Sequence, residues 1–183
     1  MTETHNAEDR ISFLCGLRAV RSFRPEPVPQ DVVDDVLEVA RWSGSAGNKQ
    51  PWEILVIRDP ETLGALADVE GYAGHLAGAP LGIVLAMAGE RPEQAAYDEG
   101  RLTERIMLAA WAHGVGSGIG WIVGSGREAA RELLKIPSGR MVRTAISLGY
   151  PDETARRPRS RAGQAHKPLS EIVHEEQYDR NPG

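Results

Sequence analysis

Apolar residues in this chain recur either at the spacing of a helix or in short continuous runs, and the two patterns alternate along the sequence. Residues 30–42 predict a helix because their apolar side chains share one face, opposite a row of acidic ones. The apolar residues of that face are Val32, Val33, Val36, Leu37 and Ala40. A longer helix is predicted over residues 95–113, and Gly114 is expected to end it.

Four short apolar runs predict buried strands between these helices. The runs are residues 53–58, 81–88, 119–123 and 142–148. A further helix is expected to start at Pro60, and Ser125 with Glu128 predicts a capping box for a helix over residues 127–134. Because helices alternate with short buried strands, the pattern favours either an α/β or an α+β domain.

The character of the chain changes after Pro151. Residues 152–168 contain almost nothing that could build a core, and apolar residues return only at Leu169, Ile172 and Val173. We therefore expect residues 1–151 to form a single domain. Residues 152–183 are expected to form a C-terminal arm, which either belongs to that domain or docks on a partner subunit.

Composition narrows the class of protein. The chain has 183 residues, of which 41% are hydrophobic and 26% charged, as in an ordinary soluble domain. Its net charge of −5 argues against nucleic acid as a partner. Cys15 is the only cysteine, which favours a reducing, cytoplasmic setting. The first ten residues lack the pattern of a signal peptide, and no apolar stretch approaches the ~20 residues of a membrane span.

Several common kinds of active site are excluded by their motifs. The glycine-rich residues 113–120 do not match G-x-G-x-x-G, and no phosphate-binding G-x-x-x-x-G-K-[ST] loop occurs. The five histidines are scattered without the spacing of metal ligands, so no metal is expected. The chain also lacks the G-x-S-x-G elbow of hydrolases. If the protein is an enzyme, a cofactor is expected to carry its chemistry.

Two segments contain side chains suited to binding such a cofactor. Arg18, Arg21 and Arg24 recur at a spacing of three, and guanidinium groups suit phosphate oxygens and the carbonyl edge of a flat ring. The loop of residues 43–52 combines glycines, hydroxyls and side-chain amides ahead of a tryptophan. Each segment alone also fits a plain structural role, the first as a solvated basic turn and the second as a polar loop with Trp52 in the core.

Together the two segments resemble the nitroreductase family. The matching stretches are RSFRPEPVP at residues 21–29 and NKQPW at residues 48–52, with the predicted helix between them. Weaker similarity continues at residues 114–117, at Trp121 and at residues 166–169. The resemblance implies an α+β fold with a central, mostly antiparallel sheet flanked by helices. It also implies a homodimer that holds FMN at the subunit interface, with an extended C-terminal arm.

The resemblance also implies a function and a set of FMN-binding positions. The chain would transfer hydride from NADH or NADPH, through flavin N5, to a small-molecule electron acceptor such as a nitroaromatic or a quinone, with no catalytic side chain. Arg18 would contact the phosphate or ribityl chain, Arg21 the N1/O2 edge, and Lys167 would close over the phosphate. The implied cofactor-binding residues are Arg18, Ala19, Arg21, Gly44, Ser45, Asn48, Gln50, Gly120, Trp121 and Lys167.

Departures from the family pattern keep an alternative open. Leu17 and Ala19 replace an arginine and a serine, which removes two phosphate contacts, and Gly44 stands where proline is usual. A flavin-binding or storage protein, or a family member without reductase activity, therefore remains an alternative to the reductase. The tryptophans are expected mostly in the core, with Trp121 also a candidate to flank the flavin.

Overall fold

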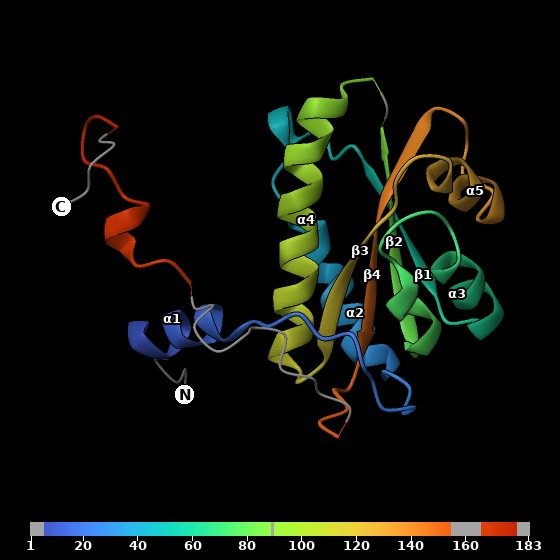
Figure 1. Cartoon of the computed structure of the whole chain (residues 1–183), viewed down its shortest axis with the longest axis horizontal. Coiled ribbons are helices and arrows are strands. Elements are labelled where there is room, and N and C mark those ends of the chain that lie inside the picture. The colour runs from blue at the N-terminus through green and yellow to red at the C-terminus, as the bar shows by residue number, and fades with distance from the viewer. Residues whose placement is uncertain (1–5, 89, 155–165, 179–183) are drawn as a thin grey trace. The chain divides into compact units, whose positions relative to one another are not determined.

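The computed structural model of the chain describes residues 6–88, 90–154 and 166–178 (Figure 1). It divides into two compact units, Met1–Glu153 and Thr154–Gly183. The helices of the first unit are α1 Ala7–Gly16, α2 Gln30–Arg41, α3 Pro60–Ala67, α4 Pro92–Ala112 and α5 Gly126–Leu133. Its strands are β1 Trp52–Ile57, β2 Leu81–Ala88, β3 Gly116–Trp121 and β4 Arg140–Gly149. Three short 3-10 turns are η1 Ala46–Asn48, η2 Gly74–Gly78 and, in the second unit, η3 Leu169–Glu171.

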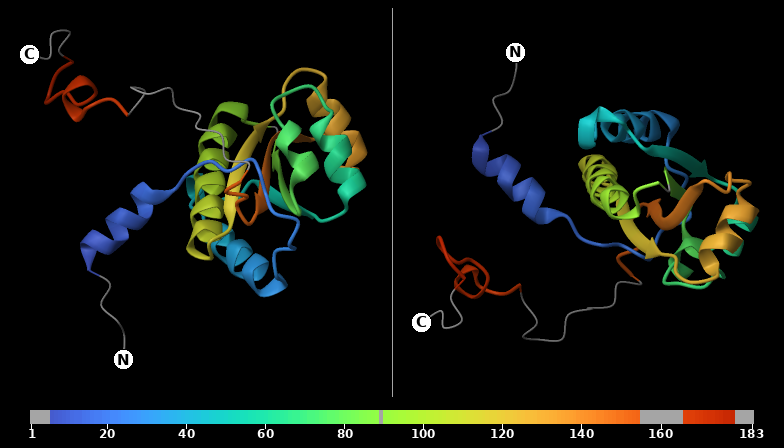
Figure 2. Two further views of the ribbon diagram at one scale, coloured as in Figure 1. Left: turned by 60° about the horizontal axis from the view of Figure 1, so that its bottom comes forward. Right: turned by 90° about the horizontal axis from the view of Figure 1, so that it is seen from above.

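The four strands form one sheet in the order β1-β2-β4-β3, and every pairing within it is antiparallel. One face of the sheet packs against α2 and α4, and the other against α3, α5 and η2 (Figure 2). The antiparallel pairing decides between the two classes that the sequence left open. The predicted α+β fold is confirmed.

The alternation of side chains along β2 explains how both faces are covered. Ile83 and Leu85 pack towards α2 and α4, whereas Val84 and Ala86 pack on the opposite side. The prediction that residues 53–58 form a buried strand was wrong in one respect. β1 is only half-buried because it lies at the edge of the sheet, with β2 as its single neighbour.

Two elements begin three positions before the predicted residue. α4 begins at Pro92, three positions earlier than expected, because proline is well tolerated in the first turn of a helix. β3 begins at Gly116 rather than at residue 119. Its glycines leave room for a neighbouring segment, since a Cβ at Gly118 would lie 2.4 Å from the carbonyl oxygen of Val20.

The predicted capping box at Ser125 was wrong. Ser125 precedes α5 in a helical conformation, and its side chain caps no amide of that helix. Its backbone N–H and its hydroxyl instead both donate to Oε2 of Glu70, at 2.9 and 2.7 Å. These hydrogen bonds hold the pKa of the Glu70 carboxyl below its ordinary value. A carboxylate distant in the sequence therefore binds the start of α5, which a local motif cannot reveal.

A β-bulge brings a charged residue of β4 into the core. Leu85 pairs with Thr144 and Ala86 with Val142, so Arg143 is the extra residue on the bulged strand. The Nε of Arg143 donates to Oε2 of Glu99 in α4, and both side chains are buried. This buried ion pair links α4 to the sheet.

We predict that Arg143→Met lowers the free energy of unfolding by about 3–5 kcal/mol, because the Glu99 carboxylate then stays buried without a partner. The double variant Arg143→Met/Glu99→Leu should recover most of that loss, since no uncompensated charge remains. Urea unfolding of the three proteins measures both changes. A double variant as unstable as Arg143→Met would contradict the explanation.

Candidate functional site

The segment that follows α1 lies along the outer edge of β3. Ala19 forms a parallel bridge with Ser117, and the N–H of Val20 donates to the carbonyl oxygen of Ser117 at 2.7 Å. Phe23 then forms an antiparallel bridge with Pro151. The predicted arginine segment is therefore held against an edge strand rather than forming a solvated turn.

Arg18 and Arg21, the two arginines that the resemblance implies to bind FMN, have different contacts. The stem of Arg21 lies over β3, where a Cβ at Gly118 would be 3.0 Å from its Cγ. Arg18 turns back towards α1, and its Nη1 donates to the carbonyl oxygens of Cys15 and Leu17 at 2.6 and 2.7 Å. Arg21 thus lies beside β3, whereas Arg18 binds the carbonyl end of α1.

The backbone of β3 presents hydrogen-bonding groups to the same edge. The carbonyl oxygen of Trp121 accepts from the N–H of Tyr72 at 2.7 Å, on the side of β3 that faces away from β4. In a strand the N–H and the C=O of one residue point the same way, so the N–H of Trp121 also faces this edge. Gly120 is tightly packed, because a Cβ there would lie 2.9 Å from that of Ala73.

The loop of residues 43–52 is held in shape by its own side chains. Oγ of Ser45 accepts from the N–H of Gln50 at 2.8 Å, and Nε2 of Gln50 lies 3.3 Å from Oδ1 of Asn48. Asn48 and Gln50 have positive φ values of 54° and 48°, next to Gly47 at 60°. Three predicted binding side chains are therefore clustered, with their loop in a conformation that few residues tolerate.

Gly44 leaves space for the side chain of Arg101, a residue that the sequence analysis did not predict to matter. A Cβ at Gly44 would lie 2.1 Å from Nη2 of Arg101, so the guanidinium occupies the space next to the backbone. Nη1 of Arg101 lies 3.9 Å from the carboxylate of Asp98, which is buried on α4. The proline that is usual at this position would not leave that space, and no local motif pointed to Arg101.

The predicted residues form two groups at opposite edges of the sheet. The first group, with Ser45, Asn48 and Gln50, precedes edge strand β1. The second group lies on or beside edge strand β3, and its members are Ala19, Arg21, Gly120 and Trp121. One chain does not bring these groups together. Lys167 lies in the second unit, and its predicted contact with a phosphate stays a prediction.

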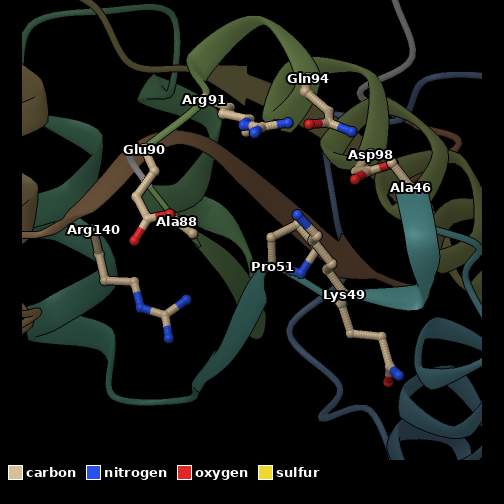
Figure 3. A pocket seen from close by; sticks show the side chains of 11 residues that line it. Ala46, Lys49, Pro51, Ala88, Glu90, Arg91, Gln94, Asp98 and Arg140 are labelled. Atoms are coloured by element: carbon tan, nitrogen blue, oxygen red, sulfur yellow. The ribbon is translucent and has the colours of Figure 1, made fainter.

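A cavity of about 320 Å³ lies next to the loop (Figure 3). Its walls come from η1, from the first turns of α4 and from the start of β4. Its polar lining residues are Lys49, Gln50, Glu90, Arg91, Gln94, Asp98 and Arg140. Only Gln50 among them was predicted to bind a ligand. Arg91 and Gln94 precede or begin a helix whose start was predicted too late.

His75 is a second residue that sequence reasoning missed. Its Nδ1 lies 2.7 Å from Oγ of Ser147, and its Nε2 lies 3.2 Å from the carbonyl oxygen of Ile119. Burial lowers the pKa of the imidazole, and the hydrogen bond to Ile119 opposes that change only partly. The neutral ring therefore donates a hydrogen bond from Nε2 to the carbonyl oxygen of Ile119, and its Nδ1 accepts a hydrogen bond from the Ser147 hydroxyl. The ring binds the backbone of β3 one position before Gly120.

Neither a metal site nor a membrane-spanning helix is found in the described parts of the chain. No three His, Cys, Asp or Glu side chains there gather into a group that could hold a metal ion. No helix in those parts is both long and apolar enough to cross a membrane.

The chain is an α+β protein in which the side chains predicted to bind a cofactor lie at both edges of an antiparallel sheet. The nitroreductase family matches this chain over residues 16–70. An NADH dehydrogenase/NAD(P)H nitroreductase homologue of Archaeoglobus fulgidus is 32% identical over 155 residues, which cover 80% of this chain and 87% of the relative. An NADH dehydrogenase of Thermus thermophilus is 30% identical, over 74% of this chain and 83% of its own.

A solved structure leads to the same family. An FMN-dependent nitroreductase from Clostridium difficile superimposes with a TM-score of 0.81 at 26% identity, covering 92% of this chain and 99% of its own. The chain therefore belongs to the nitroreductase family and is an oxidoreductase. The resemblance inferred from the two sequence segments is confirmed.

We predict that His75 makes the fold less stable in acid. The unfolded chain takes up this proton near the ordinary pKa of 6.5, whereas the folded chain does so only at lower pH. Because the unfolded state then binds more protons, the free energy of unfolding should fall as the pH drops from about 7 to about 5. His75→Asn should show a smaller fall, measured by urea unfolding at both pH values. An equal pH dependence in the two proteins would contradict this assignment.

Proposed function

We propose that the chain is a cytoplasmic FMN-dependent enzyme that transfers hydride from NAD(P)H to a small electron acceptor such as a nitroaromatic or a quinone. The observation that carries the proposal is the outer edge of β3, where Arg21 lies beside Gly118 and the backbone N–H of Trp121 faces outward, in a member of this family. The similarity to an FMN-dependent nitroreductase from another organism supports it.

The residues at that edge fit FMN by the chemistry of their donors. Arg21 lies beside β3 and supplies a fixed positive charge, which stabilises a reduced, anionic flavin ring. The N–H of Trp121 faces the same edge and is a donor for the ring nitrogen. FMN, when bound, supplies the two-electron chemistry, so the chain needs no nucleophile of its own. Its residues hold and orient the ring and stabilise charge.

Ser45, Asn48 and Gln50 complete the site from a second copy of the chain. They lie before β1, at the sheet edge opposite to Arg21, so they reach the same cofactor only across a dimer interface. A shared site of this kind requires a two-fold symmetric dimer.

The chain exposes large apolar side chains that such a dimer interface could bury. Trp42, expected in the core, is 67% exposed at the end of α2, and Ile11 on α1 is 60% exposed. Leu169 and Ile172 on the second unit are exposed as well. We propose that α1 and the C-terminal arm dock on the partner subunit, which would bring Lys167 to the phosphate. Large apolar groups left in water otherwise oppose solubility.

One observation favours the alternative of a flavin-binding protein without reductase activity. Leu17 and Ala19 offer no phosphate contact, and Arg18 donates to the end of α1 instead of pointing outward. A weakly held cofactor would still give a family member with little turnover. The two functions differ in whether NAD(P)H reduces the bound flavin.

We predict that the purified protein, after incubation with FMN and gel filtration, keeps an absorption band near about 450 nm, and that NAD(P)H bleaches this band without oxygen. Absence of the band would contradict the cofactor assignment. A band that NAD(P)H leaves unchanged would favour the flavin-binding protein instead.

We predict that two inactive variants restore activity when co-expressed. Arg21→Ala damages the β3 edge, and Asn48→Gly removes a loop side chain while tolerating the positive φ of 54°. If each site takes Arg21 from one subunit and Asn48 from the other, half of the chains form mixed dimers with one intact site each. The mixture should then regain about a quarter of wild-type activity.

The control for that experiment is Arg21→Ala co-expressed with the double variant Arg21→Ala/Asn48→Gly. No intact site forms in any of its dimers, so activity should stay at the level of the single variants. If the first mixture also regains nothing although dimers form, the two groups act within one chain and the shared site is wrong.

A further inference from the structure

The cavity beside the loop has a lining that the FMN site does not account for. Apart from Gln50, the residues implied to bind FMN lie outside it. The cavity holds about 320 Å³, near the lower end of the range of small-molecule pockets, which suits half of a dinucleotide rather than a whole one. It is open beside a loop that the proposed function assigns to the flavin.

The cavity is lined by charges of both signs, including Glu90 and Arg140, and two further cations favour an anion on one side of it. Lys49 comes from the loop, and Arg91 lies at the N-terminal end of α4. Both side chains are exposed, and neither has an ion pair or side-chain hydrogen bond within the described parts of the chain. The positive end of a 21-residue helix adds to their potential. Two free cations at a helix start form a suitable site for phosphate.

Asp98 and Gln94 form a second set of polar groups in the cavity, and their chemistry suits a ligand with hydroxyl groups. The side chain of Asp98 is only 6% exposed, lines the cavity and meets its cation, Arg101, at the long distance of 3.9 Å. Gln94 lies one turn before it on the same helix and adds an amide. Figure 3 shows Arg91, Gln94 and Asp98 in a row along one wall. Carboxylate and amide oxygens next to a phosphate site suit the hydroxyls of a ribose.

We propose that this cavity binds a phosphoribosyl group of NAD(P)H, the electron donor, and thereby positions that donor beside the flavin. Lys49 and Arg91 bind its phosphate. The carboxylate of Asp98 accepts hydrogen bonds from the ribose hydroxyls, and the amide of Gln94 both accepts and donates them. The inference rests on the proposed function for the identity of the donor. FMN also carries a phosphate and hydroxyls, so the experiment must separate the two sources.

ADP-ribose is the probe, because it carries the phosphoribosyl groups of the donor but no nicotinamide and needs no flavin chemistry. Its Kd is measured by calorimetry on flavin-loaded protein, for wild type, Lys49→Gln, Arg91→Gln and the double variant. We expect each substitution to raise that Kd about tenfold, the loss typical of a charge-assisted hydrogen bond. The Kd of FMN, from flavin fluorescence, should change less than about twofold in the same proteins.

Arg105→Gln is the matched control, because Arg105 is an exposed cation on the same helix and outside the cavity. It should leave both constants unchanged. An FMN Kd that rises with the ADP-ribose Kd would overturn the proposal, since the cavity would then hold the phosphate of FMN. Wild-type protein that does not bind ADP-ribose would also overturn it. ADP-ribose binding through Lys49 and Arg91, without any reduction of bound flavin by NAD(P)H, would keep the site and reject the proposed function.

Discussion

The burial of both faces of the central strand pair β2–β4 is the constraint on which the rest of the structure depends. β2 is apolar along its length, so helices must cover it on both sides. α2 and α4 take one face, and α3, α5 and η2 the other. β1 and β3 are left as the two edges. The groups predicted to bind a cofactor lie at or beside those edges, because the outer side of an edge strand has backbone groups that no neighbouring strand occupies.

Polar groups inside the core follow from the same constraint. Arg143 enters the apolar side of the sheet through a bulge and meets Glu99, and this charge pair is the link between α4 and the strands. His75 binds the carbonyl group of Ile119 and the hydroxyl of Ser147, and so connects η2 to β3 and β4. Both ring nitrogens of His75 have a partner, whereas only Oε2 of the buried Glu99 carboxylate is paired and Oε1 has no hydrogen-bond partner among the described residues.

The glycines of β3 connect the fold to the site. Gly116, Gly118 and Gly120 alternate with larger residues, and a Cβ at any of them would lie within 3.0 Å of a neighbouring atom. The segment of residues 19–21 can therefore lie against the strand, which brings Arg21 beside it. At Gly44 the space left by the missing side chain is filled by the guanidinium of Arg101, which comes from α4.

The sequence by itself determined the kinds of elements, the apolar faces of α2 and α4, and the family, because periodicity and a short motif are local properties of the chain. It did not determine the antiparallel strand order, the exposure of Trp42, or the binding of Ser125 by Glu70, since each depends on residues far apart in the sequence. The cavity between the loop and α4 likewise arose only from packing. The tertiary structure also decided that the two predicted groups lie at opposite sheet edges, and this separation is the physical reason to expect a second subunit.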